Sequence, residues 1–471
     1  MKITLIFPPS LYQTKQTMPP LGIAYIAAVL RENGFPEVRL VDAVVNRYGN
    51  EEIVSLLKKE TPDLVGLSFG TQNRFYAFGL ARAIKKEFPD LPIVVGGPHP
   101  TLTFDDILKN IPEIDAVVRG EGEYAFLEIV RALDQKKDLA GILGVSFRNA
   151  QGTIVHNGDR PPIADLDSLP LPARDLLPIE KYRQKIPLSQ EICTSILSSR
   201  GCPYNCVYCS TSQQWGHRIR HRSPENVIAE IEQLMKNYTL DGVGFFDDVL
   251  TMDKARVIEI CRLMIEKKLN IAWWCEARAN TVDEEIINWM KKAGCVHISM
   301  AMESGSNRIL KNIKKAITVE QGIKAVKIIK EAGLKLKVFF MYGLPGETFE
   351  DIEKTVALSQ YFKNELGVEE TTQGLTIIYP GTQLERIAKQ TGMLAKDFSW
   401  SLPYEEKRDY APLSTCSNMP VFEQKELSYE QLFKYLKKAK LKYYFRHPFN
   451  LLKNLKRHRK TIKKWLTTKI K

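Results

Sequence analysis

The sequence contains no apolar run of the length, about 20 residues, that is needed to cross a bilayer. Its first nine residues include an apolar stretch, but this stretch is too short for the hydrophobic segment of a secretory signal. Hydrophobic residues make up 44% of the chain and charged residues 26%, which are the proportions of an ordinary globular protein. We therefore expect a protein that is made and kept in the reducing cytoplasm.

Cysteine is scarce, with 8 in 471 residues, yet Cys202, Cys206 and Cys209 are spaced C-x3-C-x2-C. A zinc site normally uses four ligands in two pairs, and three close cysteines cannot all form disulfides. The spacing favours three thiolates that bind three irons of a [4Fe–4S] cluster and leave the fourth iron open. The alternative is that these three are buried thiols grouped by chance. We interpret the five other cysteines as buried small hydrophobic residues: Cys193, Cys261, Cys275, Cys295 and Cys416.

The motif Ser-Arg-Gly-Cys-Pro-Tyr-Asn-Cys-Val-Tyr-Cys-Ser at residues 199–210 resembles that of the radical S-adenosylmethionine (SAM) superfamily. The resemblance implies a [4Fe–4S] cluster whose open iron is chelated by the amino and carboxylate groups of SAM. It also implies that Tyr208, between the second and third cysteines, lies near the adenine of SAM.

The basic residues are unevenly distributed along the chain. The last 41 residues hold fifteen of the 67 Lys and Arg and none of the 55 Asp and Glu. The first 430 residues therefore carry 52 basic and 55 acidic side chains, a net charge of −3, although the whole chain carries +12. A nearly neutral body argues against a nucleic-acid surface spread over the catalytic domains.

The first part of the chain alternates short apolar runs with segments of helical periodicity. We expect strands at residues 3–7, 37–40, 64–68, 93–95 and 116–118. We expect helices between them at residues 22–31, 51–59, 75–87 and 103–109. This alternation predicts a doubly wound, Rossmann-like α/β domain over residues 1–137, with ligands at the carboxyl ends of its parallel strands.

Glycine-rich loops follow several of these strands and would let the backbone approach a large ligand closely. With the Pro-Pro-Leu-Gly-Ile-Ala run at residues 19–24, they resemble the cobalamin (B12)-binding domain of B12-dependent radical SAM enzymes. The resemblance implies cobalamin contacts from Ser68, Gly70, Gly97, Pro98, His99, Gly120, Glu121, Gly122 and Glu123. The D-x-H-x-x-G motif that supplies a cobalt ligand in other cobalamin proteins is absent, so an empty, vestigial domain stays an alternative.

Residues 138–190 read as a connection, with a hairpin at residues 144–156 followed by a proline-rich passage. Beyond it we expect six strands, at residues 194–199, 242–246, 271–275, 297–301, 336–341 and 374–378. The helices between them are expected at residues 225–237, 254–267, 283–292, 319–332 and 349–364. Six such units predict a partial (β/α)6 barrel over residues 191–415, with functional groups at the carboxyl ends of its strands. The radical SAM superfamily has this fold.

Polar residues follow the expected barrel strands. By the family resemblance, Asp247, Arg278 and Glu303 are expected in the SAM pocket, and Gly343 and Gly346 are expected to shape it. Carboxylates suit ribose hydroxyls or the SAM ammonium, and a guanidinium suits a carboxylate. The remaining acidic residues at strand ends, Asp248, Glu276 and Glu347, are interpreted as caps of the helices that follow. No residue is singled out by the sequence as a catalytic acid or base.

Two basic segments have no assigned partner. The run Trp-Gly-His-Arg-Ile-Arg-His-Arg-Ser at residues 215–223 suits a solvated face, an ordered loop beside the cluster or a contact with an anionic substrate. In the tail, residues 416–471, apolar side chains recur at helical spacing among Lys and Arg. This pattern suits the surface of an anionic membrane, and a helix packed on the barrel or contact with RNA are the alternatives.

The resemblance implies a cobalamin-dependent radical SAM enzyme that cleaves SAM to a 5′-deoxyadenosyl radical and methylates an unactivated carbon of a lipid-like or other hydrophobic metabolite. The resemblance also implies an electron donor such as flavodoxin or ferredoxin, and nucleic acid is not an expected partner. The alternatives are a radical cyclase, oxidase or rearrangement enzyme, and a non-catalytic iron–sulfur redox protein.

Overall fold

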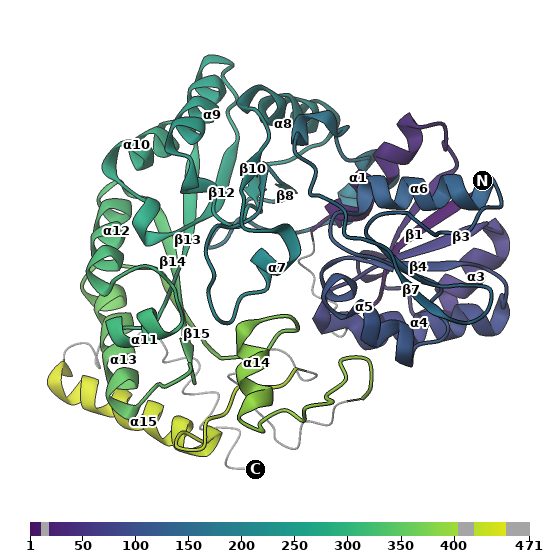
Figure 1. Ribbon diagram of the computed structural model, residues 1–471. Coiled ribbons are helices and arrows are strands. Elements are labelled where there is room, and N and C mark those ends of the chain that lie inside the picture. The colour runs from purple at the N-terminus through teal and green to yellow at the C-terminus, as the bar shows by residue number, and fades with distance from the viewer. Residues whose placement is uncertain (11–17, 404–418, 449–471) are drawn as a thin grey trace, which may run out of the picture.

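The computed structural model describes residues 1–10, 18–403 and 419–448. Two α/β units lie side by side, with the N-terminal sheet in purple and blue and the larger, barrel-like sheet in teal and green (Figure 1). Each unit has its own hydrophobic core, so the two predicted folding units are both present. Cys416 and residues 449–471 lie outside the described residues.

The N-terminal sheet has seven strands, of which the first five in sequence are parallel. In spatial order they are β2 (Val38–Asp42), β1 (Ile3–Phe7), β3 (Leu64–Ser68), β4 (Ile93–Gly96), β5 (Ala116–Val118), β6 (Val145–Arg148) and β7 (Ile154–His156). Because the strand order reverses direction at β1, the crevice between the ends of β1 and β3 is the expected ligand site of a doubly wound sheet.

Helices cover both faces of this sheet. One face holds α1 (Leu21–Glu32) and α6 (Gly122–Asp134), and the other holds α3 (Asn50–Glu60), α4 (Arg74–Glu87) and α5 (Pro98–Asn110). The expected strands are confirmed, but α5 begins five residues earlier than predicted and α6 was not predicted. Proline at the first helical position starts α5, directly after Gly97 at φ 98°. The glycine at the start of α6 masks its helical pattern.

The predicted linker belongs partly to this first unit. The predicted hairpin is confirmed: β6 and β7 pair antiparallel with each other, and β6 joins the sheet antiparallel to β5. The proline-rich passage then runs between the two units. The amide of Ala173 donates to the carbonyl of Ala24 at 3.0 Å, and the guanidinium of Arg174 donates to the carbonyl of Ser195 at 2.6 Å. The passage thus straps the barrel to α1.

The second sheet has six parallel strands in consecutive order. They are β8 (Cys193–Ile196), β11 (Gly242–Phe245), β12 (Ala272–Ala277), β13 (Cys295–Glu303), β14 (Lys335–Tyr342) and β15 (Glu370–Leu375). The helices that cover them are α8 (Pro224–Asn237), α9 (Lys254–Glu266), α10 (Glu284–Lys292), α11 (Asn307–Asn312), α12 (Val319–Glu331) and α13 (Phe349–Asn364). Since β8 pairs with β11 but not with β15, the barrel is open and the predicted partial (β/α)6 fold is confirmed.

The first and sixth barrel strands differ from their predicted ranges. The first strand ends at Ile196, and the chain continues as β9 (Ser199–Arg200), which pairs antiparallel with β10 (Arg220–His221). The last strand, β15, lies four residues earlier than expected because Lys337 of β14 pairs with Glu370 at its start, 2.8 Å apart.

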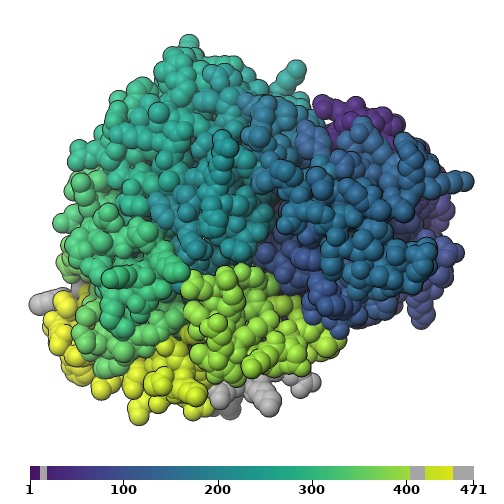
Figure 2. Space-filling model, viewed as in Figure 1, coloured from purple at the N-terminus to yellow at the C-terminus, as the bar shows by residue number. Residues whose placement is uncertain are grey.

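The C-terminal region packs on the barrel. In α15 (Tyr429–Arg446), Leu432, Leu436, Ala439 and Tyr443 are buried in a core shared with α13. Figure 2 shows the light-green segment around α14 (Gln383–Gln390) between the barrel and the N-terminal unit. No helix among the described residues has the length and apolarity required to span a membrane.

Glu347 lies in the loop from β14 to α13 and is buried, with 4% of its surface exposed. Its Oε2 accepts the amide proton of Gly343 at 2.7 Å, and burial raises its pKa to about 8. The start of α13 is stabilised instead by Asp351, whose carboxylate accepts the amide proton of Thr348 at 3.0 Å. The prediction that Glu347 caps this helix is therefore wrong.

The two glycines of this loop have φ angles of 80° at Gly343 and 75° at Gly346, which favour glycine. The amide of Gly346 donates to Oε1 of Gln424 at 2.7 Å, so the loop is also tied to the C-terminal segment. Their part in shaping the SAM pocket stays a prediction.

We expect Glu347→Gln to remove a pH dependence of stability. The folded pKa of Glu347, about 8, exceeds its ordinary value of 4.5, so folding takes up a proton between these values. The free energy of unfolding should therefore fall as pH rises from about 5 to 8, by up to about 1.4 kcal/mol per unit. Glutamine keeps the acceptor for Gly343 and cannot lose a proton.

Urea unfolding of both proteins at about pH 5.5 and about pH 7.5 measures this difference. The wild type should lose more stability than Glu347→Gln between the two pH values. An equal loss in both would contradict the raised pKa.

Candidate functional site

The three predicted cluster ligands lie in one loop, between β9 and α7 (Thr211–Trp215). Cys206 is buried, Cys202 and Cys209 are half-buried, and all three are free thiols. The amide of Cys209 donates to the carbonyl of Cys206 at 3.1 Å, which closes a tight turn. Burial raises the pKa of Cys202 and of Cys209, and the charge of a neighbouring cysteine adds to this rise in each.

The donor set fits a [4Fe–4S] cluster rather than a single ion. Within the described residues, no three His, Cys, Asp or Glu side chains are grouped to hold one metal ion. A [4Fe–4S] cluster has no such requirement, because each cysteine binds a different iron at its own corner of the cube. The loop therefore offers three thiols of the chemistry that such a cluster needs, and one iron would remain open to SAM.

Glu303, Tyr208 and Lys315 form a buried polar group beside this loop. The hydroxyl of Tyr208 donates to Oε1 of Glu303 at 2.7 Å. The ammonium of Lys315 lies 2.9 Å from the same carboxylate oxygen and 3.1 Å from the tyrosine hydroxyl. Glu303 has a φ of 65°, where the register between β13 and β14 shifts, and such strain in a non-glycine residue is typical of functional sites. Tyr208 and Glu303, which were both predicted to lie at the SAM site, are thus hydrogen-bonded to each other.

Lys315 was missed by sequence reasoning. Its context, Lys-Asn-Ile-Lys-Lys at residues 311–315, is typical of a solvated helix face and carries no signal of a buried site. In the structure only 7% of its side chain is exposed, because the chain is bent on both sides of it. Lys314 and Ala316 both have left-handed backbones, with φ angles of 54° and 53°. The strained turn places the ammonium beside Glu303.

Arg278 belongs to the same site. Its guanidinium stacks on the ring of Tyr204, a residue of the cysteine loop, with 3.5 Å from Cζ to the ring centroid. It also donates to the carbonyl oxygen of Lys315. Burial raises the pKa of Cys202, and the positive charge of Arg278 opposes this rise. The predicted placement of Arg278 at the mouth of the barrel is consistent with these contacts.

Asp248 and Glu276 were predicted to cap helices, and this prediction is wrong. The caps of α9 and α10 are Asp253 and Asp283, each of which accepts an amide proton at 3.0 Å. Asp248 instead accepts a hydrogen bond from Thr211 at 3.2 Å, and burial raises its pKa to about 6. Burial and the charge of Asp248 also raise the pKa of Glu276. Both carboxyl groups therefore belong to the region of the cysteine loop.

Asp247 was expected in the SAM pocket, but its carboxylate is fully engaged elsewhere. Oδ1 accepts the amide proton of Ser198 at 2.8 Å, and Oδ2 accepts the hydroxyl protons of Ser198 and Ser199. Only 1% of the residue is exposed. These bonds turn the chain from β8 into β9, so Asp247 supports the cysteine loop from below and offers no free oxygen to SAM.

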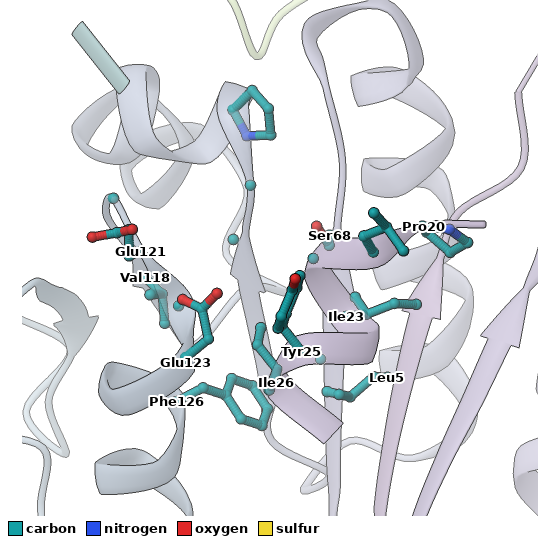
Figure 3. A pocket seen from close by; sticks show the side chains of 18 of the residues that line it. Leu5, Pro20, Ile23, Tyr25, Ile26, Ser68, Val118, Glu121, Glu123 and Phe126 are labelled. Carbon is teal, nitrogen blue, oxygen red and sulfur yellow. The ribbon is translucent and has the colours of Figure 1, made fainter. Parts of the chain in front are cut away.

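A mostly apolar cavity of about 280 Å³ opens at the carboxyl ends of β1, β3, β4 and β5. Figure 3 shows Glu121 and Glu123 on one side of it and Pro20, Ile23 and Tyr25 on the other. Of the residues predicted to contact cobalamin, those that line the cavity are Ser68, Gly97, Pro98, Gly120, Glu121, Gly122 and Glu123. Gly70 and His99 do not line it.

Glycine geometry at this cavity fits a large, flat ligand. Gly97 has a φ of 98°, and a Cβ there would lie 3.0 Å from the carbonyl oxygen of Phe69. Gly120 has a φ of 75° with open space around its Cα, and a Cβ on Gly122 would press on Ile26 at 3.0 Å. Because these positions carry no side chain, a corrin ring could approach the backbone closely there. The residues present fit cobalamin at the reversal point of the strand order.

His99 lies on the other side of the Gly97–Pro98 turn. It is fully buried among the rings of Phe69, Phe78 and Trp400, and burial lowers its pKa well below 6.5. Its Nδ1 lies 3.2 Å from the hydroxyl of Thr71. Its ring packs against the C-terminal segment, so the predicted cobalamin contact through His99 does not fit this placement.

Glu121 and Glu123 line the cavity, but their carboxylates are also paired with arginines of the barrel unit. Arg200 bonds both glutamates at 2.6 Å, and Arg220 bonds Glu121 at 2.7 Å. All four side chains are at most 6% exposed. The basic run at residues 215–223 therefore includes an arginine, Arg220, that helps to order the cysteine loop, which was one of its three interpretations.

Comparisons with known proteins match both units. The radical SAM superfamily matches residues 196–359, and the B12 binding domain matches residues 11–130. An uncharacterized methyltransferase of Pyrococcus horikoshii is 36% identical over 97% of this chain and 95% of its own length. The anaerobic magnesium-protoporphyrin IX monomethyl ester cyclase of Rubrivivax gelatinosus is 33% identical over 73% of this chain and 62% of its own length.

Among solved structures, the cobalamin-dependent radical enzyme OxsB with aqua-cobalamin bound has a TM-score of 0.74. It is 19% identical and the match covers 92% of this chain and 65% of that chain, which shows a shared fold. The matches to both domains, and a relative that is similar over nearly the whole chain, agree with the fold described above. This chain belongs to the B12-binding radical SAM family, as a methyltransferase-like enzyme that uses a [4Fe–4S] cluster, SAM and cobalamin.

Proposed function

We propose that this enzyme methylates an unactivated carbon of an apolar, lipid-like substrate. The observation that carries the proposal is the shared wall of the two cofactor sites. Leu197, Arg200, Gln214 and Trp215, which flank the cysteines in sequence, line the cobalamin cavity of the other domain. A methyl donor in that cavity would therefore lie next to the site where SAM is cleaved.

When bound, the cluster supplies the electron that cleaves SAM, and cobalamin supplies the methyl group. Cys202, Cys206 and Cys209 would hold the cluster. Glu303 would accept hydrogen bonds from SAM, because Tyr208 and Lys315 both bond its Oε1, and no hydrogen bond from the described residues reaches its Oε2. Lys315 also balances the charge of this buried carboxylate, which would be costly alone.

The inner face of the barrel supports an apolar substrate. Along β11 and β14, Phe245 and Phe340 pack against the helices, so Phe246 and Phe339, their neighbours in sequence, point to the opposite face. Phe246 is 46% exposed and contacts the ring of Trp274 edge-on at 5.4 Å. Exposed aromatic surface next to Asp247 and the cysteine loop favours a substrate that brings apolar carbon to the radical.

The basic face of α15 supports contact with an anionic membrane surface from the cytoplasmic side. Leu441 and Phe445 are 59% and 85% exposed, one helical turn apart, and lysines surround them along the helix. Apolar side chains framed by lysine suit the interface of an anionic bilayer. The opposite face of α15 packs on the barrel, so the packed-helix interpretation of the tail also holds for this part of it.

Radical cyclisation is the competing function, because one relative is a cyclase. The products distinguish the two reactions. Methylation yields both S-adenosylhomocysteine and 5′-deoxyadenosine, whereas cyclisation yields 5′-deoxyadenosine without S-adenosylhomocysteine. A non-catalytic iron–sulfur protein is not supported, since the chain belongs to an enzyme family. An electron donor such as flavodoxin or ferredoxin would reduce the cluster.

Anaerobic purification with iron, sulfide and hydroxocobalamin tests the cofactors first. We expect about four irons and one cobalt per chain, with the absorption of both groups. Cys206→Ala should lose the cluster and the cleavage of SAM. The matched control is Cys295→Ala, which removes a buried thiol away from the loop and should retain both. Four irons without cobalt in the wild type would contradict the methylation proposal.

Glu303→Gln should weaken SAM binding. Loss of the negative charge removes a charge-assisted hydrogen bond, so the dissociation constant of SAM should rise about tenfold. Equilibrium binding to the cluster-loaded protein measures it, and iron content serves as the control for an intact loop. Unchanged affinity with full iron content would exclude Glu303 from the SAM pocket.

Replacing both Leu441 and Phe445 by Ser should reduce binding to vesicles that contain anionic phosphatidylserine by at least about tenfold, because two apolar anchors are lost. The control is Leu143→Ser, which removes an exposed apolar side chain (42%) from the N-terminal unit and should leave binding unchanged. Vesicle flotation measures the bound fraction. Equal binding of all three proteins would contradict membrane contact through α15.

A further inference from the structure

Arg200 is the residue at which the two domains meet most tightly. It directly precedes Gly201 and Cys202, and its guanidinium bonds the carboxylates of Glu121 and Glu123, both at 2.6 Å. Its Cζ also lies 5.4 Å from the ring centroids of Tyr25 and Trp215. The guanidinium is therefore surrounded by two carboxylates and two aromatic rings. All four of these partners line the cobalamin cavity.

The far end of the cysteine loop is held by the same carboxylate. Arg200 in β9 lies opposite Arg220 in β10, and these two short strands close the loop of residues 201–219. Arg220 bonds Glu121 at 2.7 Å. It also donates to the carbonyl of Ile163, in the proline-rich passage between the two units, at 2.7 Å. The amide of Ile163 donates to Glu121 at 2.6 Å. Both ends of the loop are thus fixed to Glu121, the residue that directly precedes α6.

We infer that Arg200, Arg220, Glu121 and Glu123 form an interdomain lock that sets the position of the cysteine loop relative to the cobalamin cavity. The inference rests on the proposed function, because it gives the lock the task of aligning SAM cleavage with methyl transfer. The four residues are positioning residues. Cluster assembly depends on the cysteines and should survive loss of the lock, whereas the alignment of the two cofactors should not.

The chain provides a matched control for a buried ion pair without this task. Glu230 of α8 is also held between two arginines, Arg174 at 2.6 Å and Arg222, and all three side chains are at most 5% exposed. None of these three residues lines the cobalamin cavity. Loss of the Glu230 charge leaves Arg174 and Arg222 without their carboxylate. Loss of the Glu121 charge leaves Arg220 without one and Arg200 with Glu123 alone, so both substitutions should destabilise the fold.

The experiment compares Glu121→Gln with Glu230→Gln in the full chain loaded with cluster and cobalamin. Pulsed electron paramagnetic resonance measures the dipolar coupling between the reduced cluster and cob(II)alamin, which reports their separation without turnover. In Glu121→Gln we expect a weaker, broadened coupling and a cobalamin dissociation constant raised at least about tenfold. Iron content should stay within about twofold of wild type in both variants, because neither substitution removes a cysteine of the loop.

Glu230→Gln should retain the wild-type coupling and cobalamin affinity. Equal changes in the two variants, or an unchanged coupling in Glu121→Gln, would overturn the lock. If Glu121→Gln does not fold, Glu123→Gln removes only one of the two carboxylates on Arg200 and should give the same change in smaller degree.

A second measurement separates this inference from the proposed function. In the cofactor-free protein, hydrogen exchange at residues 199–201 and 219–221 should rise in Glu121→Gln and not in Glu230→Gln. Wild-type protein with four irons and no cobalt would contradict the proposed function, and the exchange comparison would still test the lock. Unchanged exchange in Glu121→Gln would overturn it whatever the cofactor content.

Discussion

The carboxylate of Asp247 ends the first barrel strand, and the placement of the cysteine loop depends on this. A strand that continued to residue 199, as its apolar pattern suggests, would carry Arg200 and Cys202 further along the barrel wall. By accepting bonds from Ser198 and Ser199, Asp247 turns the chain out of the sheet after Ile196. The chain can then form β9, pair with β10 and present three thiols above the strand ends.

The parts of the fold that depend on local patterns were predictable from the sequence. The spacing of Cys202, Cys206 and Cys209 predicts ligands of an iron–sulfur cluster. Short apolar runs between helical segments predict the parallel strands. Of the elements that were missed or shifted, α6 begins at a glycine and β15 begins at a residue of a cross-strand ion pair. Their limits are set by contacts with distant residues, such as Lys337 with Glu370, and not by periodicity.

The acidic residues at the strand ends show why a site is harder to predict than a fold. Asp247 and Asp248 are adjacent in sequence, and their expected roles are reversed in the structure: the first supports the loop and the second faces the region of the thiols. Both residues lie in the loop after β11, which ends at Phe245, so their position at a strand end does not tell which of them faces the thiols. Lys315 was beyond prediction because its burial depends on two strained residues in a charged run.

Desolvation explains how the polar residues are grouped around the two cofactor sites. A buried ion is costly unless it is paired, and here the glutamates are matched with cations: Glu121 and Glu123 with two arginines, and Glu303 with Lys315. Asp248 lacks such a partner, and its pKa is raised to about 6. The charges that border the cobalamin cavity are thus balanced by the other domain. Separation of the domains would expose or unpair Glu121, Glu123 and their two arginines. The ion pairs that complete the cavity therefore also hold the cysteine loop beside it.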